Sequence, residues 1–193
     1  GGIVVLWSNQ ATRAYGTISA KGGEQSGNGG LVETSGSDLD IGGIRVDASS
    51  SNGKAGQWLI DPTNISINAA TAATYSTSLN NGTDVIVSTD GTITLESTAT
   101  ISKTSGNQTV KLELITTGSG KDITLSGIIS ASSGILNIIL TATGKIKVNN
   151  TVTTPSGAVT LTAGDAITQS GAMTGTTLTA KTLKNGGGAA ITL

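Results

Sequence analysis

The 193-residue sequence contains no cysteine and no histidine, and only 2 prolines. Without cysteine and histidine the chain cannot form disulfides, thiol-dependent active sites, histidine-based nucleophilic triads or ordinary zinc sites. The lack of cysteine also leaves the cellular compartment undetermined. We therefore expect no metal and no cofactor, and we do not expect an enzyme.

Large aromatic side chains are also scarce, since phenylalanine is absent and aromatics make up 2% of the chain. A globular core built on large rings is thereby excluded. Isoleucine, leucine, valine and many threonines remain, and these residues fit a pleated, half-buried surface. The composition predicts an all-β fold with a narrow core.

The chain also lacks an excess of either charge, since it has 11 basic and 12 acidic residues. The cations do not cluster, so we expect no nucleic-acid partner. No apolar run approaches the ~18 to 20 residues that a membrane-spanning helix needs. The sequence opens in mid-pattern at Gly1-Gly2-Ile3, with no initiator methionine or signal peptide, so we expect a fragment of a longer protein.

Short strand-like segments of similar sequence recur along the chain. One set of strand-like segments reads GTITL at 91–95, KDITL at 121–125 and GKIKV at 144–148, and a second set lies at 110–114, 136–140 and 158–162. Repetition at roughly 20 to 30 residues is typical of a solenoid whose units stack into one core. We predict a single elongated domain over 1–193, with repetitive coils over 84–193.

The first third, 1–67, is strand-rich, but its units are less alike, so we predict irregular coils there. The glycine-rich stretch at 22–30 supplies positions for sharp turns. It lacks the Gly-Lys-Ser/Thr ending of a phosphate-binding loop and precedes no strong helix. We therefore interpret it as a corner between coils.

One segment, 68–83, departs from the strand pattern. It places Ala72, Tyr75 and Leu79 at helical offsets. Asn68 or Thr71 can cap its start, and the Asn81-Gly82 pair is a typical stop. This pattern predicts one short helix near 70–80, packed against the flank of the solenoid.

Several motifs identify a resemblance that covers most of the chain. They are GGIVVLWS at 1–8, YGTISAKGG at 15–23, GNGGLVETSG at 27–36, GKAGQWLIDPTNISI at 53–67 and AVTLTAGDAITQSG at 158–171. These motifs resemble the filamentous haemagglutinin family of large exoproteins, and the segment at 53–67 is the strongest match. The Asn-Pro-Asn motifs of that family's secretion domain are missing. The chain thus resembles the region just downstream of the secretion domain.

The resemblance implies a right-handed parallel β-helix from an adhesin-like protein, secreted or held at the surface of a Gram-negative bacterium. It implies export by two-partner secretion, in which an outer-membrane pore recognises an upstream domain that this sequence does not contain. Members of the family serve as adhesins, haemolysins or toxin carriers, so a receptor on a host-cell or bacterial surface is the implied partner. We also expect end-to-end self-association through the strand edges at the two ends.

The alternative is a polysaccharide lyase or hydrolase on a β-helix scaffold. Asp38, Asp40 and Asp47 lie close in sequence with Arg45 between them, and stacked coils could join them into a carbohydrate site, an acid/base pair or a calcium site. However, Asp38 and Asp40 flank Leu39 on the outer face of an alternating strand, where charge is ordinary. We favour a solvated face.

Two further sets of residues have a functional and a structural interpretation. Candidate glycosylation sequons begin at Asn64, Asn81, Asn107 and Asn149, a number expected by chance in a chain so rich in serine and threonine. Trp7, Trp58 and Tyr15 could form a sugar-binding platform. Each lies in an apolar, strand-like run, so we predict that all three pack in the core.

Overall fold

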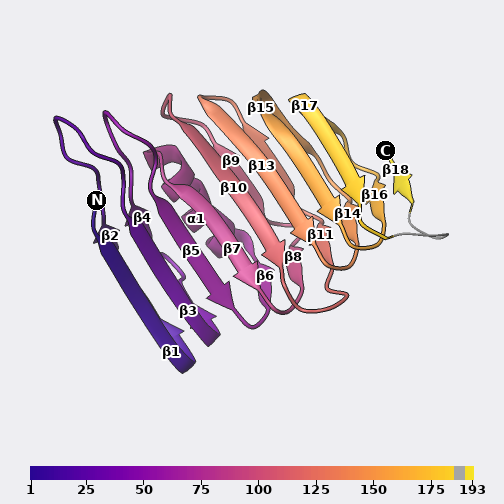
Figure 1. Cartoon of the computed structure of the whole chain (residues 1–193), viewed down its shortest axis with the longest axis horizontal. Coiled ribbons are helices and arrows are strands. Elements are labelled where there is room, and N and C mark those ends of the chain that lie inside the picture. The colour runs from indigo at the N-terminus through magenta and orange to yellow at the C-terminus, as the bar shows by residue number, and fades with distance from the viewer. Residues whose placement is uncertain (185–189) are drawn as a thin grey trace.

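The computed structural model describes residues 1–184 and 190–193, which form a parallel β-solenoid of about seven turns with one short helix (Figure 1). The expected fold class is confirmed. Within the predicted repetitive region, 185–189 lies outside the described residues.

One long parallel sheet forms a broad face of the solenoid, and its strands lie side by side in Figure 1. In order of pairing, they are β1 (Ile3–Arg13), β3 (Leu31–Asp40), β5 (Gln57–Pro62), β7 (Asp84–Thr89), β10 (Thr109–Thr116), β13 (Ile135–Ala142), β15 (Val152–Ala163) and β17 (Met173–Thr182). Every coil contributes one strand, so backbone hydrogen bonds run along the whole solenoid.

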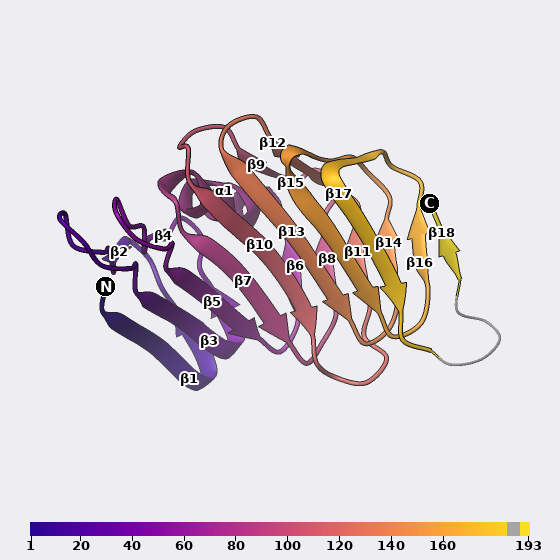
Figure 2. The same cartoon turned by 45° about the horizontal axis from the view of Figure 1, so that its top comes forward.

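Two narrower faces complete each coil (Figure 2). The second face is a six-stranded sheet of β6 (Ile65–Ile67), β8 (Ile93–Leu95), β11 (Ile123–Leu125), β14 (Ile146–Val148), β16 (Ile167–Gln169) and β18 (Ile191–Thr192). The third face holds β2 (Thr17–Ser19), β4 (Arg45–Asp47), the helix α1 (Ala69–Asn81), β9 (Thr100–Lys103) and β12 (Ile128–Ala131), and it continues into the first residues of β15.

The coils shorten along the chain. Ile3 stacks on Leu31 and Val85 on Leu112, whereas Val159 stacks on Leu178 only 19 positions away. In the first two coils, glycine-containing loops at 20–30 and 48–56 join the third-face strands β2 and β4 to the next strand of the long sheet. In the last coils these loops are gone, and β15 runs through the corner with only a register shift between Thr154 and Ala158.

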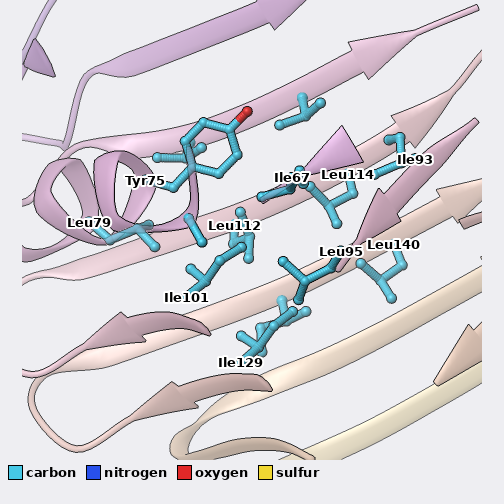
Figure 3. Close-up of a cluster of buried hydrophobic side chains, with 14 of the residues drawn as sticks. Ile67, Tyr75, Leu79, Ile93, Leu95, Ile101, Leu112, Leu114, Ile129 and Leu140 are labelled. Atoms are coloured by element: carbon cyan, nitrogen blue, oxygen red, sulfur yellow. The ribbon is translucent and has the colours of Figure 1, made fainter. Parts of the chain in front are cut away.

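Strict alternation builds the core. In β10 and β13 every second residue is buried, and the burial continues from coil to coil. One such ladder on the second face consists of Ile67, Leu95, Leu125 and Val148, all fully buried and in register. Figure 3 shows part of this interior. Burial of one such side chain contributes about 1.5–3 kcal/mol, which makes the inward columns the main source of stability.

The helix α1 takes the place of a third-face strand in the third coil. The Asn68 side chain accepts a hydrogen bond from the Thr71 backbone N–H at 2.9 Å, and Gly82 ends the helix with a φ of 91°. The predicted helix and its stop are therefore confirmed, with Asn68 as the cap. Ala72, Tyr75 and Leu79 are fully buried, so the helix contributes to the core itself; Figure 3 shows Tyr75 and Leu79 among the strand side chains. No helix of the described residues has the length and apolar character of a membrane span.

Candidate interaction surface

Asp38, Asp40 and Asp47, the acidic residues considered in the sequence, each contact a different partner residue. Asp38 pairs with Arg13 of the preceding coil at 3.7 Å, and Asp47 pairs with Lys21 at 2.9 Å. Asp40 accepts a hydrogen bond from the Tyr15 hydroxyl at 2.6 Å. Each pair joins two adjacent coils.

Their positions match the solvated-face interpretation. Asp38 and Asp40 lie exposed on β3, whereas Asp47 and the exposed Arg45 lie on β4, a strand of a different sheet. No group of three or more acidic side chains with the geometry to hold a metal ion occurs in the described parts of the chain.

The carboxyl groups of this region titrate according to these contacts. The hydrogen bond from Tyr15, with a second from the Gly42 backbone, holds the pKa of Asp40 below its usual value. Burial opposes ionisation of Asp47, but hydrogen bonds from Ser49 and Lys21 outweigh it and lower the pKa of that carboxyl. Both carboxyl groups are therefore ionised at neutral pH, because these contacts favour the charged form. Neither has the raised pKa that a general acid needs.

The four sequon asparagines are all exposed. Asn64 accepts a hydrogen bond from the Thr92 backbone at 3.3 Å, and the Asn149 amide lies 3.5 Å from the Ser126 hydroxyl. Asn81 is the last residue of α1.

The outward side of the long sheet carries apolar side chains among polar ones. At its first strand Ile3, Val5 and Trp7 are 74%, 53% and 62% exposed. The face continues through half-buried residues on the following strands, namely Leu31, Leu59, Ile86, Ile115 and Ile139. Charged pairs interrupt it, with Lys111 Nζ 2.8 Å from Glu113 Oε2. A flat sheet face of this kind suits contact with another molecule.

The prediction that all three aromatic residues pack in the core was wrong for two of them. Trp58 is fully buried, but Trp7 and Tyr15 are 62% and 59% exposed. Side chains alternate between the two sides of a strand, and in β1 the inward positions belong to Val4 and Leu6, which pack against the core. Trp7 consequently points outward.

Beside Trp7, a groove of about 510 Å³ crosses the ends of the long strands. Its lining is mostly polar and comes from successive coils: Trp7 and Asn9 from β1, Ser35 and Ser37 from β3, Asp61 from β5, Thr63 after it, Ser88 from β7, Asp90 after it, and Thr117 beyond β10. The strands β1 and β3 have 11 and 10 residues, whereas β5 and β7 have 6 each. The early strands therefore extend past the later ones and wall the groove.

Hydrogen bonds between coils fix the walls of this groove. The Ser37 hydroxyl donates to the Asn9 carbonyl at 3.0 Å, and the Ser35 hydroxyl donates to the Asp61 carbonyl at 3.2 Å. Farther along, the Thr89 hydroxyl donates to the Thr63 carbonyl at 2.7 Å. These contacts hold the backbone rigid and leave other side chains to face the groove.

Two of those side chains are carboxylates without hydrogen-bond partners among the described residues. They belong to Asp61 and Asp90, and both residues are exposed. Partial burial, together with the negative charge of Asp90, raises the pKa of Asp61. The proximity of two like charges marks this end of the groove as an acceptor-rich site.

Sequence reasoning did not select Asp61 and Asp90. The available signal was positional, because each follows the apolar part of a strand of the long sheet, and the ends of neighbouring parallel strands meet at one edge. Assigning both strands to the same face, however, requires the stacking register, which the dissimilar first coils conceal.

Comparisons with known proteins add no further assignment. No protein-family model matches the chain, and searches of curated proteins and solved structures found no match either.

Proposed function

We propose that this chain is a structural shaft and interaction surface of a secreted or cell-surface, adhesin-like bacterial exoprotein exported by two-partner secretion. The observation that carries the proposal is the outward side of the long sheet. There, apolar side chains lie exposed on β1 and partly exposed on the following strands as far as Ile139, along a ladder of parallel strands. Because each coil stacks on its neighbours, such a solenoid forms an extended rod with a regular surface along its length.

Four of the five motifs that carry the family resemblance lie in the first three coils, and the fifth, at 158–171, spans the end of β15 and β16. Trp58 in the segment 53–67 is fully buried and donates its indole N–H to Thr34 Oγ1 at 3.0 Å. Pro62 ends β5, where a missing N–H disturbs no later ladder bond. These roles fit a parallel β-solenoid, and the proposed family rests on the sequence motifs themselves. The implied partners are an outer-membrane pore, reached through an upstream domain, and a receptor on a host or bacterial surface.

Binding of the purified, fluorescently labelled chain to epithelial and bacterial cells tests the interaction surface. Ile86→Lys combined with Ile139→Lys places two charges on the outward side of the long sheet. Thr94→Lys combined with Thr124→Lys adds the same charge to half-exposed positions of the second face. We expect the first pair to reduce cell binding several-fold and the second pair to leave it unchanged. Equal effects, or no binding to any cell, would contradict the proposal.

Export is tested separately. The chain is placed downstream of a two-partner secretion domain and expressed with the matching pore protein. We expect the fusion to appear folded in the medium, as judged by resistance to protease. Retention of the fusion in cells that release the secretion domain alone would count against this part of the proposal.

The enzymatic alternative has no support from the residues first considered for it, since Asp38, Asp40 and Asp47 are engaged by Arg13, Tyr15 and Lys21. An assay for cleavage of acidic polysaccharides decides the matter. Activity that disappears in Asp40→Ala or Asp47→Ala would establish the enzyme in place of the shaft.

A further inference from the structure

We propose that the groove beside Trp7 binds a neutral oligosaccharide, with the indole ring of Trp7 stacked on a sugar and the carboxylates of Asp61 and Asp90 accepting hydrogen bonds from sugar hydroxyls. The site lies on the shaft and deepens the proposed function by naming the ligand class of one part of its surface. It therefore rests on the proposed function for its biological setting.

Shape gives the first argument. The groove crosses the ends of successive strands, from β1 to the residues after β10, so it runs along the solenoid axis. At about 4.8 Å between neighbouring strands, its length is roughly 19 Å. A volume of about 510 Å³ lies within the range of small-ligand sites. A linear oligosaccharide is an extended ligand of these proportions.

The second argument concerns the polar groups. Most lining residues are serines, threonines or asparagine. The hydroxyls of Ser35, Ser37 and Thr117 donate within the protein and can still accept from a sugar, whereas the side chains of Ser8, Asn9, Thr63 and Ser88 can donate as well. The Asp61 and Asp90 carboxylates add acceptors that no described residue satisfies. The bonds from Ser37 to Asn9 and from Thr89 to Thr63 already fix the walls, so binding would order little of the protein.

The third argument comes from Trp7. The indole ring of Trp7 is 62% exposed and forms an apolar part of an otherwise mostly polar groove. The faces of sugar rings present C–H groups that pack on such a ring, while their hydroxyls reach the surrounding polar groups. The arrangement therefore provides both halves of the contact a sugar needs.

Charge narrows the ligand class. The described residues that line the groove include two carboxylates and no lysine or arginine. Sulfated and uronic-acid polymers would meet uncompensated like charge. A basic peptide would satisfy the carboxylates and could stack a cation on Trp7. It would leave unused the hydroxyl and amide groups that form most of the lining. The observations accordingly favour a neutral glycan.

Trp fluorescence provides a direct assay. Of the two tryptophans, Trp58 is fully buried and Trp7 is exposed, so a ligand in the groove changes the Trp7 signal. The probes are maltohexaose, cellohexaose, mannohexaose and chitohexaose, with heparin fragments and hexalysine as charged comparisons. Isothermal titration calorimetry repeats each measurement, because it does not depend on tryptophan and can be applied to variants that lack Trp7.

The variants separate the groove from the rest of the surface. We expect at least one neutral hexasaccharide to bind, and Trp7→Ala to weaken its binding about tenfold, which corresponds to about 1.4 kcal/mol. Asp61→Asn combined with Asp90→Asn should weaken it several-fold. Tyr15→Ala removes the other exposed aromatic of the first coil, which does not line the groove, and should leave binding unchanged. Thermal melting confirms that each variant is folded.

Three outcomes would overturn the proposal: no neutral oligosaccharide binds at millimolar concentration, Tyr15→Ala weakens binding as much as Trp7→Ala, or hexalysine alone binds in a manner that depends on Asp61 and Asp90. The last result would assign the groove to a basic peptide. The variant with both Ile86→Lys and Ile139→Lys separates the sugar proposal from the shaft proposal, because it should lose cell binding and keep sugar binding. If no sugar binds while cell attachment persists, the sugar proposal fails and the shaft proposal stands.

Discussion

Trp58 and Tyr75 meet edge to face inside the solenoid, with their ring centroids 5.7 Å apart and their planes at 84°. Trp58 comes from β5 and Tyr75 from α1, so this contact joins the long sheet to the helix that replaces a strand. Aromatic pairs of this geometry contribute about 0.5–1.5 kcal/mol beyond their burial. The helix is thereby fixed on the core where the coils are least alike.

The Tyr75 hydroxyl is buried and has no hydrogen-bond partner among the described residues. A buried polar group without a partner costs about 1–3 kcal/mol. We expect Tyr75→Phe to raise the free energy of unfolding by up to about 1 kcal/mol, whereas Tyr75→Ala should lower it by about 3–5 kcal/mol because it leaves a cavity. Urea denaturation measures both. Destabilisation by Tyr75→Phe would show that the hydroxyl is satisfied in solution.

Thr34 is the acceptor for the buried Trp58 indole N–H. Thr34→Val keeps the volume and removes this acceptor, so we expect a loss of about 1–3 kcal/mol in the free energy of unfolding. Thr34→Ser retains the hydroxyl and serves as the matched control, with a smaller loss from the missing methyl group. The comparison requires near-ultraviolet circular dichroism to show that Trp58 keeps its environment. Equal losses in the two variants would assign no role to the hydrogen bond.

Asn68 caps α1 through the Thr71 backbone N–H. We expect Asn68→Ala to reduce stability by about 0.5–2 kcal/mol. Asn68→Asp retains the acceptor and adds a negative charge at the helix N-terminus, where the helix dipole favours it. Its stability at neutral pH should equal or exceed that of the original chain. Thermal melting at low salt measures the ranking, and an aspartate as harmful as alanine would contradict it.

Asp84 provides a prediction of pH dependence. Burial, as the largest cause, raises its pKa above the usual 3.8, although its Oδ1 accepts a hydrogen bond from the Lys111 backbone N–H at 2.9 Å. A raised pKa in the folded state means that the carboxyl stabilises the fold most below pH 3.8, and that this contribution is lost as the pH rises through the folded-state pKa. Asp84→Asn keeps an acceptor and has no proton to lose.

We therefore expect Asp84→Asn to be more stable than the original chain at pH 7, with the difference shrinking towards pH 3. Chemical denaturation at several pH values measures this trend. Asp38→Asn serves as the control for removing an aspartate charge, because Asp38 and its partner Arg13 are both exposed. A constant difference between the Asp84 variant and the original chain at all pH values would refute the assignment.

Self-association was expected from the open strand edges. In the structure, the last coil leaves the core-facing side chain of Leu178 42% exposed. We expect sedimentation velocity to show species that grow with protein concentration, and Leu178→Lys to suppress them. Thr179→Lys adds the same charge to the outward side of the same strand and should suppress them less. A strict monomer at high concentration would rule out end-to-end association.

Local patterns in the sequence predicted much of this architecture. Alternation in segments such as 110–114 and 136–140 marked the inward columns, and the spacing of Ala72, Tyr75 and Leu79 marked the helix face. These features could be predicted because they depend on side-chain periodicities of 2 and about 3.6 residues, which are intrinsic to strands and helices.

The lengths of the coils do not correlate with the sequence similarity between them. Similarity begins near Asp84, yet the stacking distance is nearly constant in the dissimilar first coils and shortens only in the last ones. Stacking depends on the positions of the strands, and loops of different composition can satisfy the same spacing. Resemblance between repeats is thus a poor guide to their geometry.

By itself, the sequence determined the fold class, the inward columns and the helix, because each follows from short-range periodicity and the lack of large rings. The tertiary structure alone decided that Trp7 faces outward while Trp58 faces inward, and that Asp61 and Asp90 share one groove. Both decisions depend on register between coils more than twenty residues apart. A single coil has no partner surface against which that register could be fixed, so the stacked solenoid places these residues.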